Sequence, residues 1–236
     1  MKFRKNIEVD VHDVDFNGVA RASSLMKYIQ SAAQDQLTQN GMSYDDLKVM
    51  HRAFILSKIK IEFTETVRTY DRLCAISYPC ESRGYSWLRC YSMEKNGQTI
   101  GRAVSVWALI DTESRELVKV NDFDLKLSTE EANSLSLDRF RLPAKVCEVG
   151  KYSVNYADVD QNGHMNNTRY PDMYSNFLPL SGKRIKSISI NFFNEAPMGD
   201  TLTIQRACSD NGFYYFRSIR SDGKINTESE IELVNI

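Results

Sequence analysis

The hexapeptide D-V-D-F-N-G at residues 13–18 recurs as D-V-D-Q-N-G at residues 158–163, with five of six positions identical. Two later segments repeat in the same order. K-I-K-I-E-F at 58–63 matches S-I-S-I-N-F at 187–192, and Y-S-W-L-R at 85–89 matches F-Y-Y-F-R at 213–217. An ordered series of matches indicates an internal repeat. The chain is therefore predicted to contain two copies of one unit, with a longer helix and loop in the first.

Within each copy, the residue pattern predicts a strand, a turn, a helix and then antiparallel strands. The opening strand is expected over residues 6–11 and again over 151–156. Apolar residues recur at helical spacing over 25–37, and Gly41 follows as a stop signal. Asn-Gly at 96–97 and Asp-Gly at 222–223 separate alternating runs, a pattern typical of β-hairpins.

These patterns assign the chain to the α+β class. Each unit is expected to be an antiparallel sheet that buries one face on a central helix. The first unit is predicted to cover residues 1–120 and the second residues 147–236. Residues 121–146 match neither copy and are predicted to connect them.

The composition argues against several classes of partner. Lys and Arg number 30 and Asp and Glu 31, so the chain lacks the positive field that nucleic acid or an anionic membrane would require. No apolar run approaches the roughly 20 residues that span a bilayer, and a cytoplasmic protein is expected. The five cysteines are scattered without a C-x-x-C pair, which predicts free structural thiols and argues against a disulfide framework or a zinc site. No cofactor and no metal are expected.

The second copy of the turn carries a histidine in a setting that suggests chemistry. Of three histidines, only His164 lies beside a carboxylate, an amide and a glycine, in D-Q-N-G-H-M-N-N at 160–167. The turn leads into a predicted helix, whose free N–H groups and dipole favour the negative charge that develops on a carbonyl under attack. The first copy has Val19 at the matching position, so its Asp and Asn side chains are expected only to shape a turn.

The same pattern, D-x-D-x-N-G, matches the first six positions of a calcium-binding EF-hand loop. The twelfth position of such a loop is a bidentate Glu. Counting from Asp158 that position is Arg169, and counting from Asp13 it is Ser24. Both copies lack the ligand that closes the site, and calcium binding is not expected.

D-x-D-x-x-G-H-x-N-N before a helix resembles the active-site segment of the hot-dog thioesterases, and the doubled arrangement resembles the acyl-acyl-carrier-protein thioesterases of bacteria and plants. R-A-V-S-V-W at 102–107 resembles that family's R-A-x-S-x-W strand, and R-E-L at 115–117 resembles the basic turn after it. The family's D-x-N-x-H-x-N-N pattern falls on Asp160, Asn162, His164, Asn166 and Asn167. The resemblance covers nearly the whole chain. It implies a double hot-dog fold and a cytosolic or plastid hydrolase of fatty acid biosynthesis that releases fatty acids from acyl carrier protein.

The family also has a glutamate in a segment that ends in Glu-Cys, and the nearest match is N-E-A at 194–196. Because the cysteine is absent, a water molecule is expected to attack directly, without a cysteinyl acyl-enzyme. Glu195 and His164 are assigned to positioning and deprotonating that water. Asp160 is assigned to holding the polar network in its working charge state, and Asn162 with nearby N–H groups to the substrate carbonyl. In related single-unit thioesterases the Asp that matches Asp160 is base or nucleophile, so either Asp160 or Glu195 can be the base here.

The sequence allows two ways for the Glu195 side chain to reach the active site. Alternation along the apolar strand 188–192 would place it on the face opposite the apolar side chains. Either that face lines the active site, or a β-bulge at Phe192-Phe193 re-aims Glu195. The counterpart of Glu195 in the first copy is Thr66, so only the second copy keeps a complete set of catalytic side chains.

Two other functions are compatible with these residues, an acyl-CoA hydrolase and a non-catalytic acyl-binding protein. An acidic carrier protein would favour a basic docking rim, for which Lys183, Arg184, Lys186 and Arg220 are candidates that can equally be ordinary solvated charges. The chain is expected to act as a monomeric pseudo-dimer or as a homodimer. Medium- or long-chain acyl groups are expected, with pocket depth set by the helix and strands of the first unit.

Overall fold

A computed structural model describes residues 1–208 and 212–236. The first copy forms β1 (Phe3–Glu8), η1 (Val11–Asp13), α1 (Ala22–Gln39), α2 (Tyr44–Val49), β2 (Arg52–Phe63), β3 (Arg72–Pro79), β4 (Trp87–Lys95), β5 (Gln98–Asp111), β6 (Leu117–Val118) and η2 (Val120–Asp122). The second copy forms β7 (Cys147–Ser153), η3 (Tyr156–Asp158), η4 (Asn167–Arg169), α3 (Tyr170–Ser175), β8 (Lys183–Phe192), β9 (Thr201–Cys208), β10 (Phe213–Ile219) and β11 (Ile225–Asn235).

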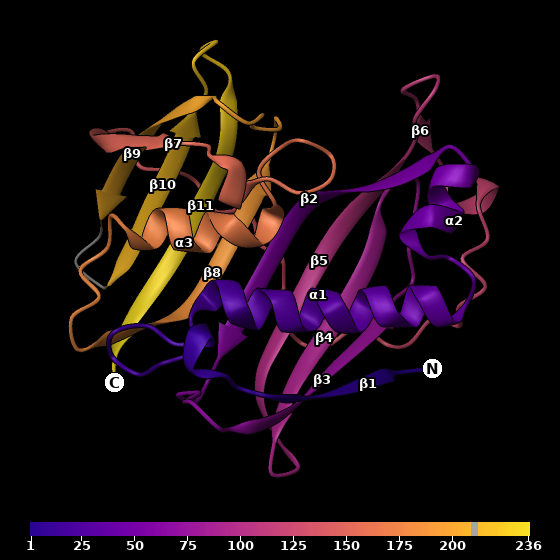
Figure 1. Cartoon of the computed structure of the whole chain (residues 1–236), viewed down its shortest axis with the longest axis horizontal. Helices are drawn as coiled ribbons and strands as arrows, with labels where there is room; N and C mark the ends of the chain where they lie inside the picture. Colours follow the sequence, from indigo (N-terminus) through magenta and orange to yellow (C-terminus); the bar gives the residue numbers. More distant parts are fainter. Residues whose placement is uncertain (209–211) are drawn as a thin grey trace.

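The strands form one antiparallel sheet in the order β1-β3-β4-β5-β2-β8-β11-β10-β9-β7, with β6 paired to β5. Figure 1 shows α1 and α3 lying against the same face of this sheet, one in front of each half. The predicted α+β architecture of two tandem units is therefore confirmed. The opening strands begin and end a few residues earlier than predicted, because Asp10 and Asn155 leave the strands to cap η1 and η3.

The two units join edge to edge through β2 and β8. In this antiparallel pair Lys60 lies opposite Ser189, and Ile59 and Ile61 lie opposite Ile190 and Ile188. Lys60 and Ser189 are each the third residue of the matching segments 58–63 and 187–192, so the central pair joins a residue to its own repeat counterpart. The joint has the geometry of a two-fold interface built within one chain.

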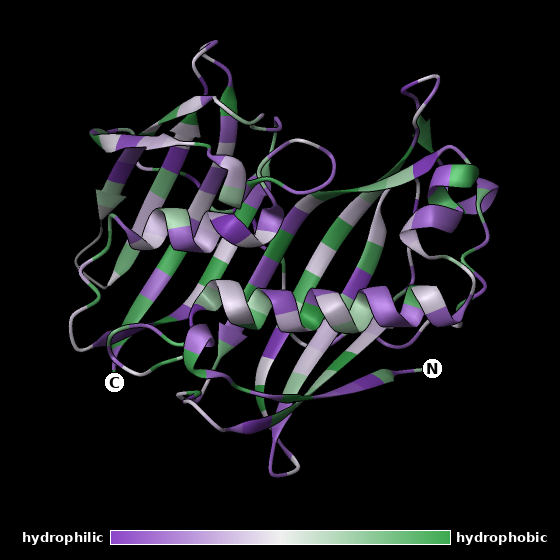
Figure 2. Ribbon diagram, viewed as in Figure 1, coloured by the Kyte–Doolittle hydropathy of each residue, from purple (hydrophilic) through white to green (hydrophobic). Residues whose placement is uncertain are grey.

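Helix α1 forms the centre of the first unit because its apolar positions follow the helical period. Its buried side chains, Leu25, Met26, Ile29 and Ala32 among them, pack into a core that continues beneath α3 in the second unit. Figure 2 shows apolar bands, in green, along the strands behind α1. The helix ends at Gln39, and Gly41 follows with a φ of +70° that suits a residue without a Cβ.

The segment between the units covers the face of the first unit's strands that lies away from α1. Leu135 and Leu137 pack against a second apolar cluster that includes Ile76 and Val104. The Asn133 Nδ2 group donates to the carbonyl oxygens of two sheet residues at 3.0 and 3.1 Å. The connecting segment therefore seals the outer face of β3, β4 and β5.

The predicted hairpin at Asn96-Gly97 is a two-residue turn between β4 and β5. Both residues have positive φ, +52° and +78°, as a type I′ hairpin turn requires. Among the helices of the described residues, none combines the length and the apolar character that crossing a bilayer would require.

Candidate active site

The turn of the second copy is held by hydrogen bonds from its own aspartates. The Asp158 carboxylate accepts from the Asn155 amide at 2.9 Å and from the Tyr152 hydroxyl at 2.8 Å, and it is buried. Burial, together with this bond to Asp158, raises the pKa of the Tyr152 hydroxyl, which therefore stays a donor. Asp158 is thus a structural anchor of the turn.

Asp160 organises the residues that follow it. Its Oδ1 accepts from the Asn162 amide at 2.9 Å, and its Oδ2 accepts from Asn166 Nδ2 at 3.3 Å. Asn166 in turn caps η4, because its Oδ1 accepts from the Thr168 amide at 2.9 Å. Asp160 therefore fixes the turn to the start of the helix.

His164 and Glu195 are brought together by backbone pairing between the turn and the segment after β8. The Met165 amide donates to the Ala196 carbonyl at 2.8 Å, and the Met198 amide donates to the Gly163 carbonyl at 3.2 Å. These bonds flank His164 and place its Nε2 3.4 Å from Glu195 Oε1. The His164 side chain is 27% exposed and that of Glu195 57%, so the pair lies at a wall that solvent reaches.

A bulge after β8 gives Glu195 its direction. The amides of Phe193 (2.9 Å) and Asn194 (3.2 Å) both donate to the Asn226 carbonyl, so two residues of one strand oppose one of the other. Strand β8 ends at Phe192, and the chain then turns Glu195 toward His164. Of the two solutions that the sequence allowed, the structure adopts the bulge.

Arg220 supports this turn from behind. Its Nη1 donates to the Glu195 carbonyl oxygen at 2.9 Å, and its Nε lies 3.4 Å from Asp200 Oδ2. Burial opposes ionisation of Asp200, but hydrogen bonds from Ser221 and Thr201 and the charge of Arg220 together hold the pKa of this carboxyl below its usual value. The sequence suggested Arg220 as a docking charge; in the structure it positions the backbone that carries Glu195.

Two other candidates for the docking rim are also engaged within the chain. Arg184 donates to the carbonyls of Phe63 and Thr64, and Lys186 donates to Glu232 at 3.0 Å. These charges brace the joint between the two units and the sheet of the second unit.

Asn162 receives a contact from the first unit that sequence reasoning missed. The hydroxyl of Tyr44, at the start of α2, donates to Asn162 Oδ1 at 3.0 Å. Within the described residues, Asn162 Nδ2 and the Asn167 amide donate to no protein acceptor, so both can serve a substrate oxygen. Nothing in the local sequence around Tyr44 signals this contact, because it joins residues more than a hundred positions apart.

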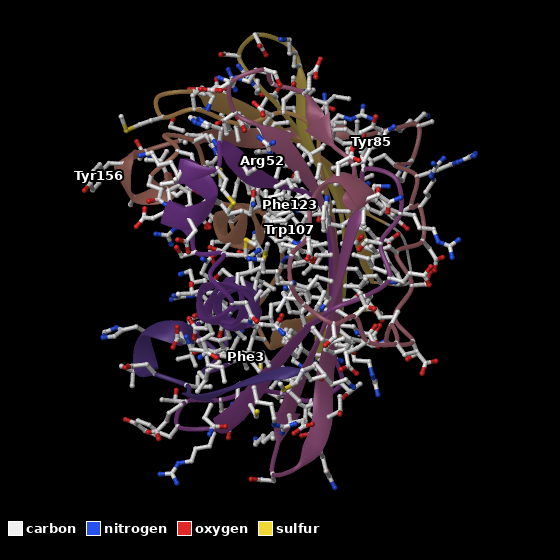
Figure 3. All side chains as sticks on the ribbon, turned by 90° about the vertical axis from the view of Figure 1, so that its right-hand side faces the viewer. Phe3, Arg52, Tyr85, Trp107, Phe123 and Tyr156 are labelled. Carbon is white, nitrogen blue, oxygen red and sulfur yellow. The ribbon has the colours of Figure 1, made fainter. Side chains whose placement is uncertain are left out.

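A cavity of about 1530 Å³ connects the turn with the interior of the first unit. Asp160, Asn162, His164 and Glu195 all line it. Its walls in the first unit come from α1, α2, β2, β4 and β5 and from the segment after β6. Apolar side chains on these walls include Leu37, Leu47, Phe54, Leu56, Trp87, Trp107, Phe123 and Leu125. Figure 3 shows Trp107 and Phe123 together in the space between helices and sheet.

The matching turn of the first copy has the same backbone but different partners. The Ala20 amide donates to the Val67 carbonyl at 2.8 Å, as Met165 does to Ala196. Asn17, the counterpart of Asn162, donates from Nδ2 to the carbonyls of Leu180 and Lys183 at 2.8 and 3.3 Å. This side chain ties the first unit to the loop after α3.

The thiols of the described residues are free. Of these, Cys80 lines the cavity, but its hydrogen bond with Cys90 and its burial raise the pKa of the Cys80 thiol. The fifth cysteine, Cys208, is also predicted to be a free thiol, but its side chain lies outside the described part of the chain. Among the described residues, no group of three or more His, Cys, Asp or Glu side chains is arranged to hold a metal ion.

Comparison with known proteins adds family evidence to this geometry. The chain is 23% identical over 226 residues to oleoyl-acyl carrier protein thioesterase 2, chloroplastic, of Arabidopsis thaliana, a match that covers 84% of this chain and 60% of the relative. It is 24% identical over 229 residues to the chloroplastic oleoyl-acyl carrier protein thioesterase of Coriandrum sativum, covering 86% and 61%. The chain thus spans about 60% of the length of these relatives.

Two solved structures have the same fold. An acyl-ACP thioesterase from Bacteroides thetaiotaomicron superposes with a TM-score of 0.90 at 20% identity, covering 99% of this chain and 98% of that one. The 12:0-ACP thioesterase from Umbellularia californica superposes with a TM-score of 0.87 at 13% identity, covering 100% and 98%.

Two family models match the two halves of the chain in order. The model of the acyl-ACP thioesterase N-terminal domain matches residues 1–125, and that of the acyl-ACP thioesterase C-terminal domain matches residues 143–235. The internal repeat agrees with this match. The chain belongs to the acyl-ACP thioesterase family.

Proposed function

We propose that the chain hydrolyses the thioester of fatty acyl-acyl carrier protein, releasing a free fatty acid and the carrier thiol. The observation that carries the proposal is the His164–Glu195 pair, 3.4 Å apart, on the wall of a cavity that continues into the first unit. Polar groups at the His164 end and apolar side chains along the walls of the first unit suit a substrate with a reactive thioester and a fatty tail.

In the proposed reaction one water molecule attacks the thioester carbon. Glu195, positioned with His164, accepts the proton of that water, as a general base within hydrogen-bond reach would. Asn162 Nδ2 and the Asn167 amide are the donors proposed for the oxyanion. Collapse of the tetrahedral intermediate breaks the C–S bond, and the leaving thiolate takes up the proton that Glu195 accepted from the water. Asp160, bonded to the Asn162 amide and to Asn166, keeps this constellation in place.

The proposed carrier is acyl carrier protein, as the names of the plant relatives suggest. The free thiols of the described residues suit a reducing compartment, and we propose that the protein acts in the cytoplasm without nucleic acid or membrane as a partner. One chain is proposed to suffice, because β2 and β8 already form the two-fold joint that a pair of single units would need.

Steady-state kinetics with matched acyl carrier protein and coenzyme A series, from octanoyl to oleoyl, test this proposal. We expect a higher kcat/KM for the carrier-protein substrates, with one free acid formed per thiol released. Equal or better turnover of the coenzyme A series would overturn the carrier assignment. Binding without hydrolysis of either series would show a non-catalytic acyl-binding protein.

A further inference from the structure

The far end of the cavity, in the first unit, is rich in hydrogen-bond donors. Arg89 lines the cavity from β4 with only 6% of its surface exposed. Its Nη1 donates to Gln36 Oε1 at 2.7 Å and to Ser77 Oγ at 2.6 Å, both neutral acceptors. Among the described residues no carboxylate pairs with this guanidinium, and its Nε and Nη2 have no protein acceptor.

Two further donors beside the cavity lack partners. Trp87, 7% exposed, precedes Arg89 by two residues on β4, so both side chains project from the same face about 7 Å apart along the strand. Its Nε1 is enclosed and has no hydrogen-bond acceptor within the described chain. The same holds for Gln30 Nε2 on α1, and both residues line the cavity.

This arrangement is costly for a pocket that holds only hydrocarbon. A buried polar group without a partner costs free energy, and a buried cation without a counter-ion costs more. Burial lowers the pKa of Arg89, which reflects the same desolvation. A methyl-terminated chain would leave these donors unpaired, whereas a carboxylate at the chain end would accept from Arg89 and neutralise its charge.

The position of these donors fits the distal end of an acyl chain. β8, β2, β5 and β4 are neighbours, with Lys58 opposite Asn191, Leu56 opposite Trp107, and Trp107 opposite Trp87. Three interstrand spacings separate β8 from β4, about 14 Å at roughly 4.8 Å each. A chain whose thioester lies at His164 and Glu195 would therefore cross β2 and β5 before its end reaches Trp87 and Arg89.

We propose that Arg89, Trp87 and Gln30 form a subsite for an oxygen acceptor at the distal end of the acyl chain, so that acyl groups with a terminal carboxylate or hydroxyl are preferred substrates. This inference rests on the proposed function, because it names the substrate class of the same site. Both kinds of acyl chain offer an oxygen at the terminus. Because Arg89 is positively charged, we expect it to bind a carboxylate more tightly than a hydroxyl.

Carrier-protein substrates in matched sets test the subsite. Each set has a methyl, a hydroxyl or a carboxyl terminus on one chain length, from octanoyl to hexadecanoyl. At the length that reaches the subsite, kcat/KM for an oxygenated chain should exceed that for the methyl chain by at least about tenfold, as for pockets built to hydrogen-bond a substrate oxygen. Trp87→Phe and Gln30→Leu should reduce this ratio, and Arg89→Met should abolish it. Arg217→Met, on β10 outside the cavity, should leave the ratio unchanged.

Thermal-shift titration with decanoic, ω-hydroxydecanoic and decanedioic acid gives a second readout that needs no turnover. The oxygenated acids should bind more tightly to the unmodified protein, and Trp87→Phe should reduce the difference even if Arg89→Met fails to fold. Hydrolysis of methyl chains at least as fast as oxygenated chains at every length, with no preference among the acids, would overturn the subsite while leaving the thioesterase intact. Loss of all hydrolysis with the binding preference retained would overturn the proposed function alone.

Discussion

At the scale of single residues, the two copies place different side chains on one backbone design. The first copy has Val19 and Thr66 where the second has His164 and Glu195, although the amide-to-carbonyl bond beside each pair is 2.8 Å in both. Neither a valine nor a threonine side chain can act as a general base near neutral pH. The chemistry is therefore expected in the second copy alone.

Glu195→Gln should lower kcat by about 10²-fold or more, the usual loss when a general base is removed. His164→Ala should lower it strongly as well. Rates with acyl carrier protein substrates measure the effect, and melting temperatures confirm that the variants fold. Glu65→Gln, exposed on the equivalent turn of the first copy, is the matched control and should keep normal kcat. A near-normal kcat in Glu195→Gln would move the base to Asp160.

A variant with all five cysteines replaced should stay active if it folds. The raised pKa of the Cys80 thiol keeps the cavity-lining cysteine protonated, and a thiol is a poor nucleophile compared with a thiolate. Mass spectrometry of the unmodified protein after rapid quenching provides the check. Detection of an acyl group on any cysteine would contradict direct attack by water.

At the scale of elements, the turn after β8 depends on an ion pair between the buried Asp200 and the partly exposed Arg220. Asp200, at the start of β9, holds Arg220, and Arg220 holds the carbonyl of Glu195. The amides of Phe193 and Asn194 share one acceptor in the bulge, so this side-chain support replaces the regular strand pairing that the turn lacks. The same contacts therefore stabilise the turn after β8 and orient the Glu195 side chain.

Asp200→Asn should destabilise the protein at neutral pH by about 1–3 kcal/mol, because the charged partner of Arg220 is lost. The folded-state pKa of Asp200 is lowered from the ordinary 3.8, so its stabilising contribution is present above about pH 4 and is lost as pH falls through the folded value. The melting-temperature gap between the two proteins should therefore be wide at about pH 7 and narrow at about pH 3. Asp222→Asn, which removes a more exposed partner of Arg220, is the control and should show a small gap. A gap of constant width across this range would exclude the charge as the cause.

At the scale of the whole molecule, each unit's Asp- and Gly-rich turn contacts the other unit, but the two contacts have different roles. Tyr44 of the first unit reaches Asn162, and Asn17 of the first unit reaches the loop after α3. Asn17 makes bonds that only hold the units together. Asn162 lines the cavity, and its Nδ2 donates to no acceptor within the described part of the chain.

Replacing these counterparts by alanine should separate stability from catalysis. Asn17→Ala should cost about 1 kcal/mol of unfolding free energy, because its partly buried partners lose their hydrogen bonds, with little change in kcat. Asp15→Asn should likewise act mainly on stability, since Asp15 accepts from the amides of Asn17 and Val19. Asn162→Ala should lower kcat by about 10²-fold, as loss of an oxyanion donor does. Denaturant unfolding and steady-state kinetics on the three variants provide the data. Loss of turnover in a stable Asp15→Asn would restore the first copy as a second site.

The sequence by itself determined the repeat, the α+β units, the Asn96-Gly97 hairpin and the turn that carries His164. These features follow from local periodicity and from residues with special backbone preferences, which act over a few positions. The tertiary structure alone decided the pairing of Lys60 with Ser189, the bulge that directs Glu195, the role of Arg220 and the contact of Tyr44 with Asn162. Each of these joins residues far apart in the chain, and its energy depends on how two preformed surfaces meet. The donors at Arg89 belong to the same group, since only packing shows that this strand residue is buried and that no carboxylate of the described residues pairs with it.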